Sequence, residues 1–436
     1  MHRPIDPMKA RHMGKWTSVA SFLFSAIALI VPSGYSLGAL LLVVGSIACL
    51  WLRPAVKLKQ EEYWLITVLV LYFVVNCAIN AYHHAEMREY DELLRFVLVL
   101  PAFALLMAYP PQANYLWSGI AIGAIGAGTF AGWQKIYQHL DRAHGTTNAI
   151  QFGNISFLLA ILSLTAMTWA IKRQKGRAWL WLLLLGTLMG LLGWLFTGSR
   201  GSGISLPICL LLFYLVSQKT FNNAHLLATA VAVILALGVL SMTPFSAVLD
   251  RSFEAVTETE DYLDQHNTHT SIGARIELLR AGIEMLPQHI WLGWGRAGMM
   301  AQKQRLIDQG KISPFTLEHT HLHNEYLDSL VKRGIPGLAM LLLLYFYPLY
   351  FFARQLHANS PSVRPYALAG AMLMICYIGF DLTQAFLTHN IGVMFLLFML
   401  AIFWSKLREQ QQLAMQPLTQ HNNRCQTQFG SSQQDQ

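Results

Sequence analysis

The stretch EHTHLHNEYLDSLVKRGIPG, residues 318–337, joins a histidine-rich segment to the start of a long apolar run. Apolar residues recur at helical spacing after Asn324, and His323 lies on the same stripe at the entry of the predicted helix. Gly334 favours a left-handed stop to that helix, and Pro336 begins the next element. That element is apolar enough to cross a membrane. The stretch therefore predicts an imidazole at the N-terminus of a helix, directly beside a membrane span.

The overall composition is that of a membrane protein. Of the 436 residues, 54% are hydrophobic and only 12% are charged, which leaves too little polar material to coat a soluble globule of this size. Runs that approach the length needed to cross about 30 Å of hydrocarbon occur throughout the chain. They lie near residues 16–33, 34–52, 62–80, 92–109, 115–133, 150–171, 178–196, 203–217, 225–242, 335–352, 366–381 and 388–405. We therefore expect an all-α polytopic membrane protein with about twelve transmembrane helices and one long helical periplasmic loop.

The distribution of basic residues predicts the side of the membrane that each loop occupies. When alternate loops are assigned to one face, most lysines and arginines fall on that face, which the positive-inside rule makes cytoplasmic. The predicted divisions are a cytoplasmic N-terminal tail at 1–15, transmembrane helices 1–9 at 16–242, a long loop at 243–334 on the opposite side of the membrane, transmembrane helices 10–12 at 335–405, and a disordered cytoplasmic tail at 406–436. Because the net charge of +8 follows this topology and forms no stripe interleaved with aromatic residues, we expect no nucleic-acid partner.

The long insert contains one clear helical pattern. The segment SIGARIELLRAGIEMLP, residues 271–287, predicts an amphipathic helix that lies over the membrane or against a partner helix. Arg275 flanks its apolar stripe. The stripe is expected to consist of Ile276, Leu279, Ile283 and Leu286.

A few basic residues break the charge bias of the periplasmic face. In its short loops these are Arg88, Lys135, Arg142 and Arg200. Arg142, Arg200 and Arg275 could bind phosphate groups, or they could simply reach toward lipid headgroups from the ends of spans. Arg200 lies in TGSRGSG, residues 197–203, where small residues leave backbone N–H groups open to an anion.

Three histidines alternate along the opening stretch. His319, His321 and His323 could bind a metal ion if the segment were extended. A helix follows at once, however, and no convincing fourth ligand is present, so we expect no metal site. Asp381, at the outer end of the eleventh run, is either a helix-end carboxylate or an orienting partner for a basic group.

Four segments give the chain a resemblance to a known family. They are His-Asn followed by nine residues and GxxG at 323–337, Arg275 with Leu279 in the same loop, the TGSRG turn, and RAHGTTNAIQFG at 142–153. Together they resemble the bacterial O-antigen ligases, which share a superfamily with O-antigen polymerases. The resemblance implies a C-type glycosyltransferase-like architecture in the bacterial inner membrane, with the active site on the periplasmic side and no cofactor. It makes the loop at 243–334 the expected periplasmic catalytic loop.

The resemblance also implies a reaction and roles for particular residues. Polysaccharide would pass from an undecaprenyl diphosphate-linked O-antigen donor to a sugar hydroxyl of a lipid A-core acceptor, with inversion at the anomeric carbon. Guanidinium forks would bind the diphosphate, and His323 would act as general base. The expected catalytic residues are His323, Arg275 and Arg200. The expected substrate-binding residues are Arg142, Arg88, Asn324, His319 and Asp381.

Two other functions stay open from the sequence. An O-antigen or exopolysaccharide polymerase of the same superfamily would share the donor chemistry, so these residues cannot separate it from a ligase. A polysaccharide or lipid transporter would place ionisable residues in the middle of its spans, where this sequence has essentially none between the span ends. Membrane lipids are expected partners in every case.

Overall fold

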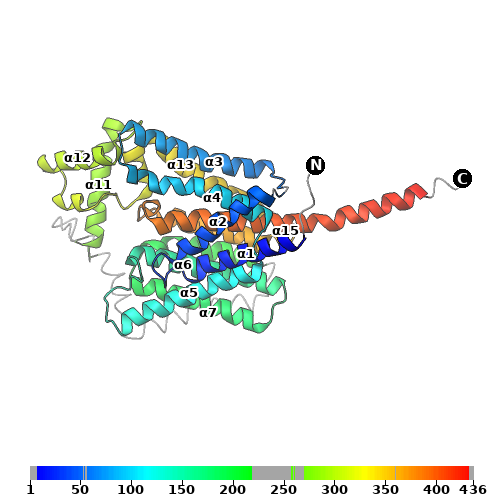
Figure 1. Cartoon of the computed structure of the whole chain (residues 1–436). Helices are drawn as coiled ribbons and strands as arrows, with labels where there is room; N and C mark the ends of the chain where they lie inside the picture. Colours follow the sequence, from blue (N-terminus) through cyan, green and yellow to red (C-terminus); the bar gives the residue numbers. More distant parts are fainter. Residues whose placement is uncertain are drawn as a thin grey trace.

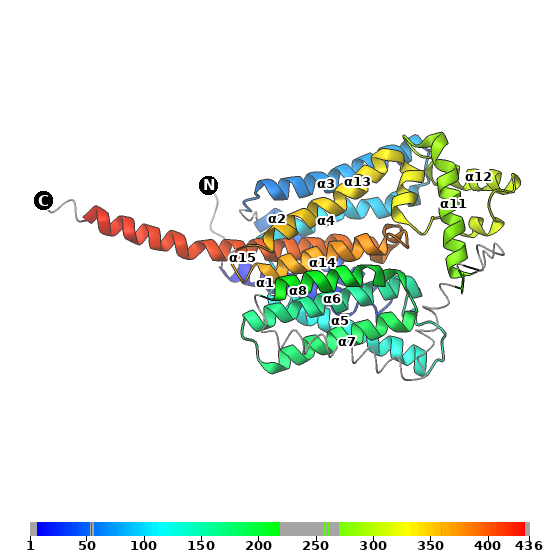
Figure 2. The same cartoon turned by 180° about the vertical axis from the view of Figure 1, so that it is seen from behind.

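The computed structural model describes residues 7–52, 54, 56–218, 257–258, 260, 270–358 and 360–431, and these residues form helices and connecting loops without a strand. The helices of the bundle are α1 (Pro7–Ala26), α2 (Gly34–Leu52), α3 (Gln60–Tyr82), α4 (Asp91–Ala108), α5 (Ala113–Ile136), α6 (Ala149–Lys172), α7 (Arg177–Thr197), α8 (Leu206–Ser217), α13 (Glu325–Gln355), α14 (Arg364–Phe380) and α15 (Asn390–Ser431). Two further helices, α11 (Ser271–His289) and α12 (Gly295–Asp308), lie across one end of the bundle (Figures 1 and 2). The short 3-10 turns are η1 (Met87–Tyr90), η2 (Gly201–Ser205), η4 (Pro314–Glu318) and η5 (Phe386–Thr388).

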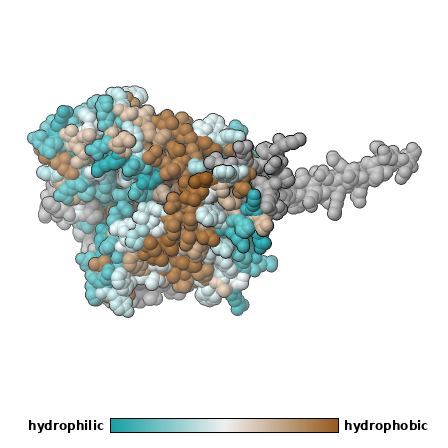
Figure 3. All heavy atoms as spheres, in the orientation of Figure 1, coloured by the Kyte–Doolittle hydropathy of each residue, from teal (hydrophilic) through white to brown (hydrophobic). Residues whose placement is uncertain are grey.

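The surface of the bundle fits a membrane. Six helices are long and apolar enough to cross one, and three shorter apolar helices accompany them in the described part of the chain. On the face shown in Figure 3, hydrophobic residues form a band across the helices, with hydrophilic residues on both sides of it. This confirms the expected all-helical, multi-pass membrane protein. The number of twelve spans stays a prediction, and the ninth expected run, at 225–242, lies outside the described residues.

Two helices form the centre of the bundle. Within their apolar windows, α6 is 94% buried and α15 is 89% buried, against 39% for α3. Large aromatic rings fill the space around α15: Trp404 stacks on Phe351 with ring centroids 3.6 Å apart. Close helix approach requires small residues, since a Cβ atom on Gly128 of α5 would lie 2.2 Å from the carbonyl oxygen of Met189 on α7.

Both ends of the chain differ from the predicted divisions. The first helix begins at Pro7, inside the expected tail at 1–15, and ends at Ala26. The tail expected to be disordered from 406 is helical as far as Ser431, because α15 continues without a break. Glutamine, leucine, alanine and methionine dominate the start of this extension and are good helix formers, so a helix already established in the bundle can propagate through them.

The external helix α11 begins at the predicted Ser271 but continues past Pro287 to His289, and the predicted buried face is wrong. Leu278, Ala281 and Met285 are fully buried, whereas Ile283 is 61% exposed. The buried residues belong to a small core of the external segment that also contains Leu322 and residues of α12 and α13. The pattern failed here because α11 has apolar residues on both faces, and contact with the neighbouring helices selects the one that packs.

The predicted stop at Gly334 is confirmed and has a structural reason. Gly334 has a φ of 65° inside α13, which divides the helix into an external part and a span. A Cβ atom there would lie 2.1 Å from the carbonyl oxygen of Trp291. The amide of Ile335 donates to the carbonyl of Ile290 at 3.0 Å. The kink therefore lets the segment between α11 and α12 pack directly on the α13 backbone.

Candidate active site

His323 is fixed by the loop that leads into α13. The buried Lys303 ammonium donates to the carbonyls of Thr316 (3.0 Å) and His319 (2.8 Å), which holds the histidine-rich segment against α12. His323 itself adopts a left-handed φ of 51°. Asn324 then caps α13, since its side-chain oxygen accepts from the amide of Leu327 at 2.9 Å. The imidazole is therefore held at the helix mouth, as the sequence predicts.

The loop between α14 and α15 closes over this helix mouth. Asp381 is fully buried, and its carboxylate accepts hydrogen bonds from the Tyr345 hydroxyl and from the amide of Phe386 (3.2 Å). The amide of Glu325 donates to the Asp381 carbonyl at 2.9 Å, and the Glu325 carboxylate accepts from the amide of Leu387 at 3.0 Å. Of the two expected roles for Asp381, the structure gives the helix-end carboxylate, because its hydrogen-bond partners are a hydroxyl and an amide.

The closed loop brings Gln384 into the centre of the histidines. Its amide oxygen accepts from Nδ1 of His323 at 2.5 Å. Its amide nitrogen lies 2.8 Å from Nε2 of His389 and 3.3 Å from Nε2 of His321. Because a carbonyl oxygen only accepts, Nδ1 of His323 must hold the ring proton, and Nε2 keeps its lone pair. One neutral side chain thus sets the tautomer of His323.

The histidines are neutral at ordinary pH. Burial, followed by the positive charge of Arg275, lowers the pKa of His323 to about 4. Burial, followed by His323, lowers the pKa of His321 to about 3, and burial lowers that of His389 to about 4. The pKa of His319 is lowered by burial and by Lys303. Each imidazole is therefore present as a free base from mildly acidic pH upward.

Arg275 interacts electrostatically with His323 and also with two other arginines. Burial, followed by the like charges of Arg142 and Arg200, lowers the pKa of Arg275, while Glu258 opposes this effect. Arg200 lies 3.8 Å from the Glu258 carboxylate. Mutual repulsion among buried guanidinium groups costs free energy, so this group favours the arrival of an anion.

The arginines come from three segments that are tied to one another. The Arg142 guanidinium Nε donates to the carbonyl of Thr197 at 2.8 Å, and the amide of Ala143 donates to the carbonyl of Phe196 at 2.9 Å. These bonds attach the loop before α6 to the turn that contains Arg200. The Glu258 carboxylate accepts from the amide of Ile272 at 2.9 Å, which links α11 to the same place.

Arg88 lies apart from the other three arginines. Its side chain is exposed and forms an ion pair with Glu86 at 3.3 Å. It lines a cavity of about 260 Å³ whose described lining includes His321 and His389 but not Arg142, Arg200 or Arg275. The sequence grouped Arg88 with the other external arginines, and the structure separates it from them.

The residues that sequence reasoning missed are neutral or distant in the chain. Gln384, His389, Lys303 and Glu258 all contact or face the site. The only local signal was the segment TQAFLTHN at 383–390, which follows Asp381 and contains two of the four. No group of three His, Cys, Asp or Glu side chains suited to a metal ion occurs among the described residues.

These features define a multi-pass helical membrane protein with a histidine and arginine site at one end of its bundle. A family model described as O-Antigen ligase matches residues 185–342, a range that contains Arg200, Arg275 and His323. The match supports membership of the chain in the O-antigen ligase superfamily, and with it a glycosyltransferase-like activity on polysaccharide and lipid substrates. The chain is also similar to an uncharacterized protein of Haemophilus influenzae, with 26% identity over 391 residues that cover 89% of this chain and 97% of that protein.

Proposed function

We propose that the chain is an O-antigen ligase that transfers polysaccharide from undecaprenyl diphosphate to a sugar hydroxyl of lipid A-core. The observation behind this proposal is the position of a neutral imidazole, with its Nε2 lone pair available, beside three clustered guanidinium groups. A glycosyl diphosphate already has a good leaving group. The remaining needs are a base for the attacking hydroxyl and positive charge for the departing diphosphate, and this site offers both.

The proposed reaction is a single displacement. The acceptor oxygen forms a bond to the anomeric carbon as its proton moves to Nε2 of His323. The bond from that carbon to the diphosphate oxygen breaks, and its electron pair remains on undecaprenyl diphosphate, where Arg275, Arg200 and Arg142 stabilise the charge. Attack opposite to the leaving group inverts the anomeric configuration. The bound diphosphate also offsets the charge of Arg275 and so makes His323 a stronger base.

The remaining candidate residues divide into substrate contacts and positioning groups. The buried Nε2 of His319 has no hydrogen-bond partner among the described residues, and the His319 ring lies 5.1 Å from that of His323. We assign it to a hydroxyl of the substrate. Asn324 and Asp381 act through the backbone they hold, and Gln384 acts through His323.

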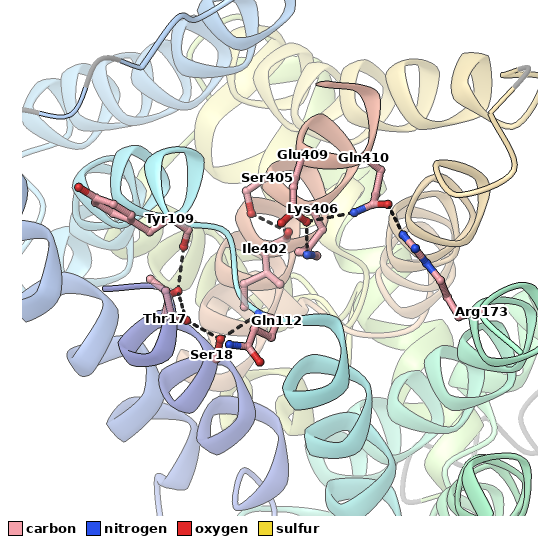
Figure 4. Close-up of polar contacts among 11 residues, drawn as sticks. Thr17, Ser18, Tyr109, Gln112, Arg173, Ile402, Ser405, Lys406, Glu409 and Gln410 are labelled. Atoms are coloured by element: carbon pink, nitrogen blue, oxygen red, sulfur yellow. Dashed lines mark hydrogen bonds and ion pairs between the residues drawn. The ribbon is translucent and has the colours of Figure 1, made fainter. Parts of the chain in front are cut away.

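The membrane side follows from the distribution of charge. Arg173 and Lys406 contact Gln410 and Glu409 of α15 at the end of the bundle opposite to α11 and α12 (Figures 1 and 4). Arg408 of α15 binds Glu61 and Glu62 at the start of α3. By the positive-inside rule that end faces the cytoplasm, so the site faces the periplasm of the inner membrane.

A reconstituted transfer assay with His323→Ala tests the proposal. Loss of the general base should reduce the rate about 10²- to 10⁴-fold while undecaprenyl diphosphate remains bound. His357→Ala, an exposed histidine in the loop after α13, is the matched control and should leave the rate unchanged. Full activity of His323→Ala would disprove the assignment. In cells lacking the protein, uncapped lipid A-core with long carrier-linked chains supports a ligase, whereas core with single-unit caps would identify a polymerase.

A further inference from the structure

Two cavities with shared lining residues lie near the histidine cluster, and the described lining of neither includes Arg142, Arg200 or Arg275. The inner cavity, of about 260 Å³, is lined by Arg88, Glu89, Glu92, Arg296, Thr320, His321, Lys332, Arg333, Thr388 and His389. The outer cavity, of about 220 Å³, shares Arg88, Glu89 and Arg296 with it and extends to the loop after α3. Together their linings extend from His321 and His389 to His83 and His84 after α3.

The cations of these cavities differ in how far their charge is already compensated. Lys332 forms a 2.7 Å ion pair with Asp328, and Arg333 interacts electrostatically with Glu92, Glu325 and Asp328. Both are therefore engaged by buried carboxylates.

Arg88 and Arg296 remain accessible to a ligand. The ion pair of Arg88 with Glu86 is exposed, and such pairs are weak. Arg296 forms no ion pair within 4.0 Å of any described residue, and its charge interacts with Glu92 only at longer range. Both guanidinium groups line both cavities. Two such groups at one boundary are suited to a phosphate, which they can bind in bidentate geometry.

The rest of the lining is suited to a sugar. Thr320 and Thr388 offer hydroxyl groups, and Glu89 and Glu92 offer carboxylates that accept hydrogen bonds from sugar hydroxyls. The imidazoles of the inner cavity share the Gln384 amide with His323. A sugar in the inner cavity would therefore lie beside the proposed general base.

We propose that these cavities bind a phosphorylated sugar of the acceptor glycolipid, with Arg88 and Arg296 on its phosphate. The proposal rests on the proposed function, since it places the acceptor on one side of His323 and the donor diphosphate on the other. It assigns the arginines of the external face to two substrates rather than to one.

A binding experiment without donor tests this assignment. Full-length protein in phosphatidylcholine nanodiscs is titrated with lipid A-core and with the same lipid after enzymatic removal of its phosphates. Arg296→Ala and Arg88→Ala should each weaken binding of the phosphorylated lipid about 10- to 100-fold, as expected for a lost charge-assisted hydrogen bond. Neither should change binding of the dephosphorylated lipid by more than about twofold. Arg305→Ala, an exposed arginine on the same helix as Arg296, should change neither.

Three outcomes would overturn the proposal. They are unchanged affinity in both variants, an equal loss for phosphorylated and dephosphorylated lipid, or a loss that appears only when phosphatidylglycerol replaces phosphatidylcholine. The last outcome would assign the arginines to a phospholipid headgroup. Arg296→Gln, which keeps more of the side-chain volume, should behave as Arg296→Ala, and unaltered binding of undecaprenyl diphosphate shows that each variant is folded.

The same variants separate this inference from the proposed function. If the protein transfers polysaccharide but Arg296→Ala has no effect on the KM for lipid A-core, the cavity assignment fails and the ligase function stands. If no transfer to lipid A-core occurs but the phosphate-dependent binding is lost in Arg296→Ala, the site stands and the ligase function fails.

Discussion

The two ends of the helix bundle both contain buried charge, but they compensate it differently. At the end from which α15 extends, Arg408 binds Glu62 directly and Glu61 at 2.9 Å. Glu62 also accepts from the indole of Trp404 (2.7 Å) and from the amide of Lys59 (2.7 Å). The Arg408 guanidinium and the Glu62 carboxylate thus each have partners of opposite character, which is what a buried ion pair requires to be tolerated.

Further ion pairs and hydrogen bonds occur at the same end of the bundle. Lys406 pairs with Glu409 along α15, and Gln410 accepts from Arg173 of the loop after α6 at 2.8 Å (Figure 4). Ser18 of α1 accepts from the amide of Gln112 at 2.8 Å in the same view. The bonds of Gln410 and Ser18 connect segments far apart in the chain, so the polar groups of this end stabilise the fold.

The external end has the opposite arrangement. Three arginines repel one another there, four histidines are kept neutral by burial, and one of them has an unpartnered ring nitrogen. Such an arrangement is costly in the absence of a ligand. The difference between the ends is that the cations of one end are paired with carboxylates, whereas Arg275 at the other end is surrounded by like charge, which fits the proposed binding of an anion there.

The largest expected effect concerns the end of the bundle where Arg408 pairs with Glu61 and Glu62. Arg408→Ala leaves Glu62 buried without its cation and should reduce the free energy of unfolding by about 3–5 kcal/mol. Measurement of denaturant unfolding in detergent gives this value, with Arg354→Ala, an exposed arginine of α13, as control. The transfer rate per folded molecule should stay unchanged. A variant that kept its stability but lost activity would break the comparison between the two ends.

The next effect concerns the external end, where stability and activity should respond in opposite ways. Arg275→Ala should slow transfer about 10²- to 10³-fold, because one donor to the developing charge is lost. Stability should be unchanged or raised, since repulsion with Arg142 and Arg200 is relieved. Arg275→Lys should restore only part of the rate, because the planar fork is missing. Arg280→Ala, exposed on the same helix, is the control. Full rescue by lysine would mean that charge alone is needed.

The fold was largely predictable because each membrane-spanning helix is one continuous apolar run, which can be recognised without knowledge of its neighbours. The run predicted at 34–52 coincides with α2, and the stop at Gly334 was readable from the residue type alone. The buried face of α11 was not, because two apolar faces compete and only the neighbouring helices decide between them. The helical continuation of α15 was missed because polar composition does not reveal whether a helix is already nucleated by packing.

The site was predictable only where the chemistry needs a charged or titratable residue. His323, Arg275, Arg200 and Arg142 were predicted in this way, and Arg275 is coupled electrostatically to each of the other three. Gln384 has neither charge nor a motif and lies 61 residues from His323 in the chain, so nothing local connects them. Arg88 could not be separated from the other arginines, since sequence does not tell which loops meet.

The smallest expected effect concerns Gln384 and is read from the pH profile. Gln384→Leu removes the acceptor for Nδ1 of His323, so the ring proton can occupy either nitrogen and the base is available in only a fraction of molecules. The rate should fall about 10- to 100-fold, as is typical when a group that orients a functional histidine is lost. Gln384→Glu keeps an acceptor at the same place, and most of the rate at pH 7 should be retained.

The glutamate variant distinguishes a positioning role from a merely structural one. A carboxylate beside His323 favours the imidazolium ion, so it raises the pKa of His323 above about 4. A general base works only when it is unprotonated, and protonation proceeds as pH falls through this pKa. The pH below which the rate declines should therefore be higher in Gln384→Glu than in the unmodified protein, with loss of rate near pH 5 and little loss at pH 7. Equal losses of rate in both variants at every pH would show that Gln384 only supports the loop. The tautomer of His323 would then not be set by Gln384.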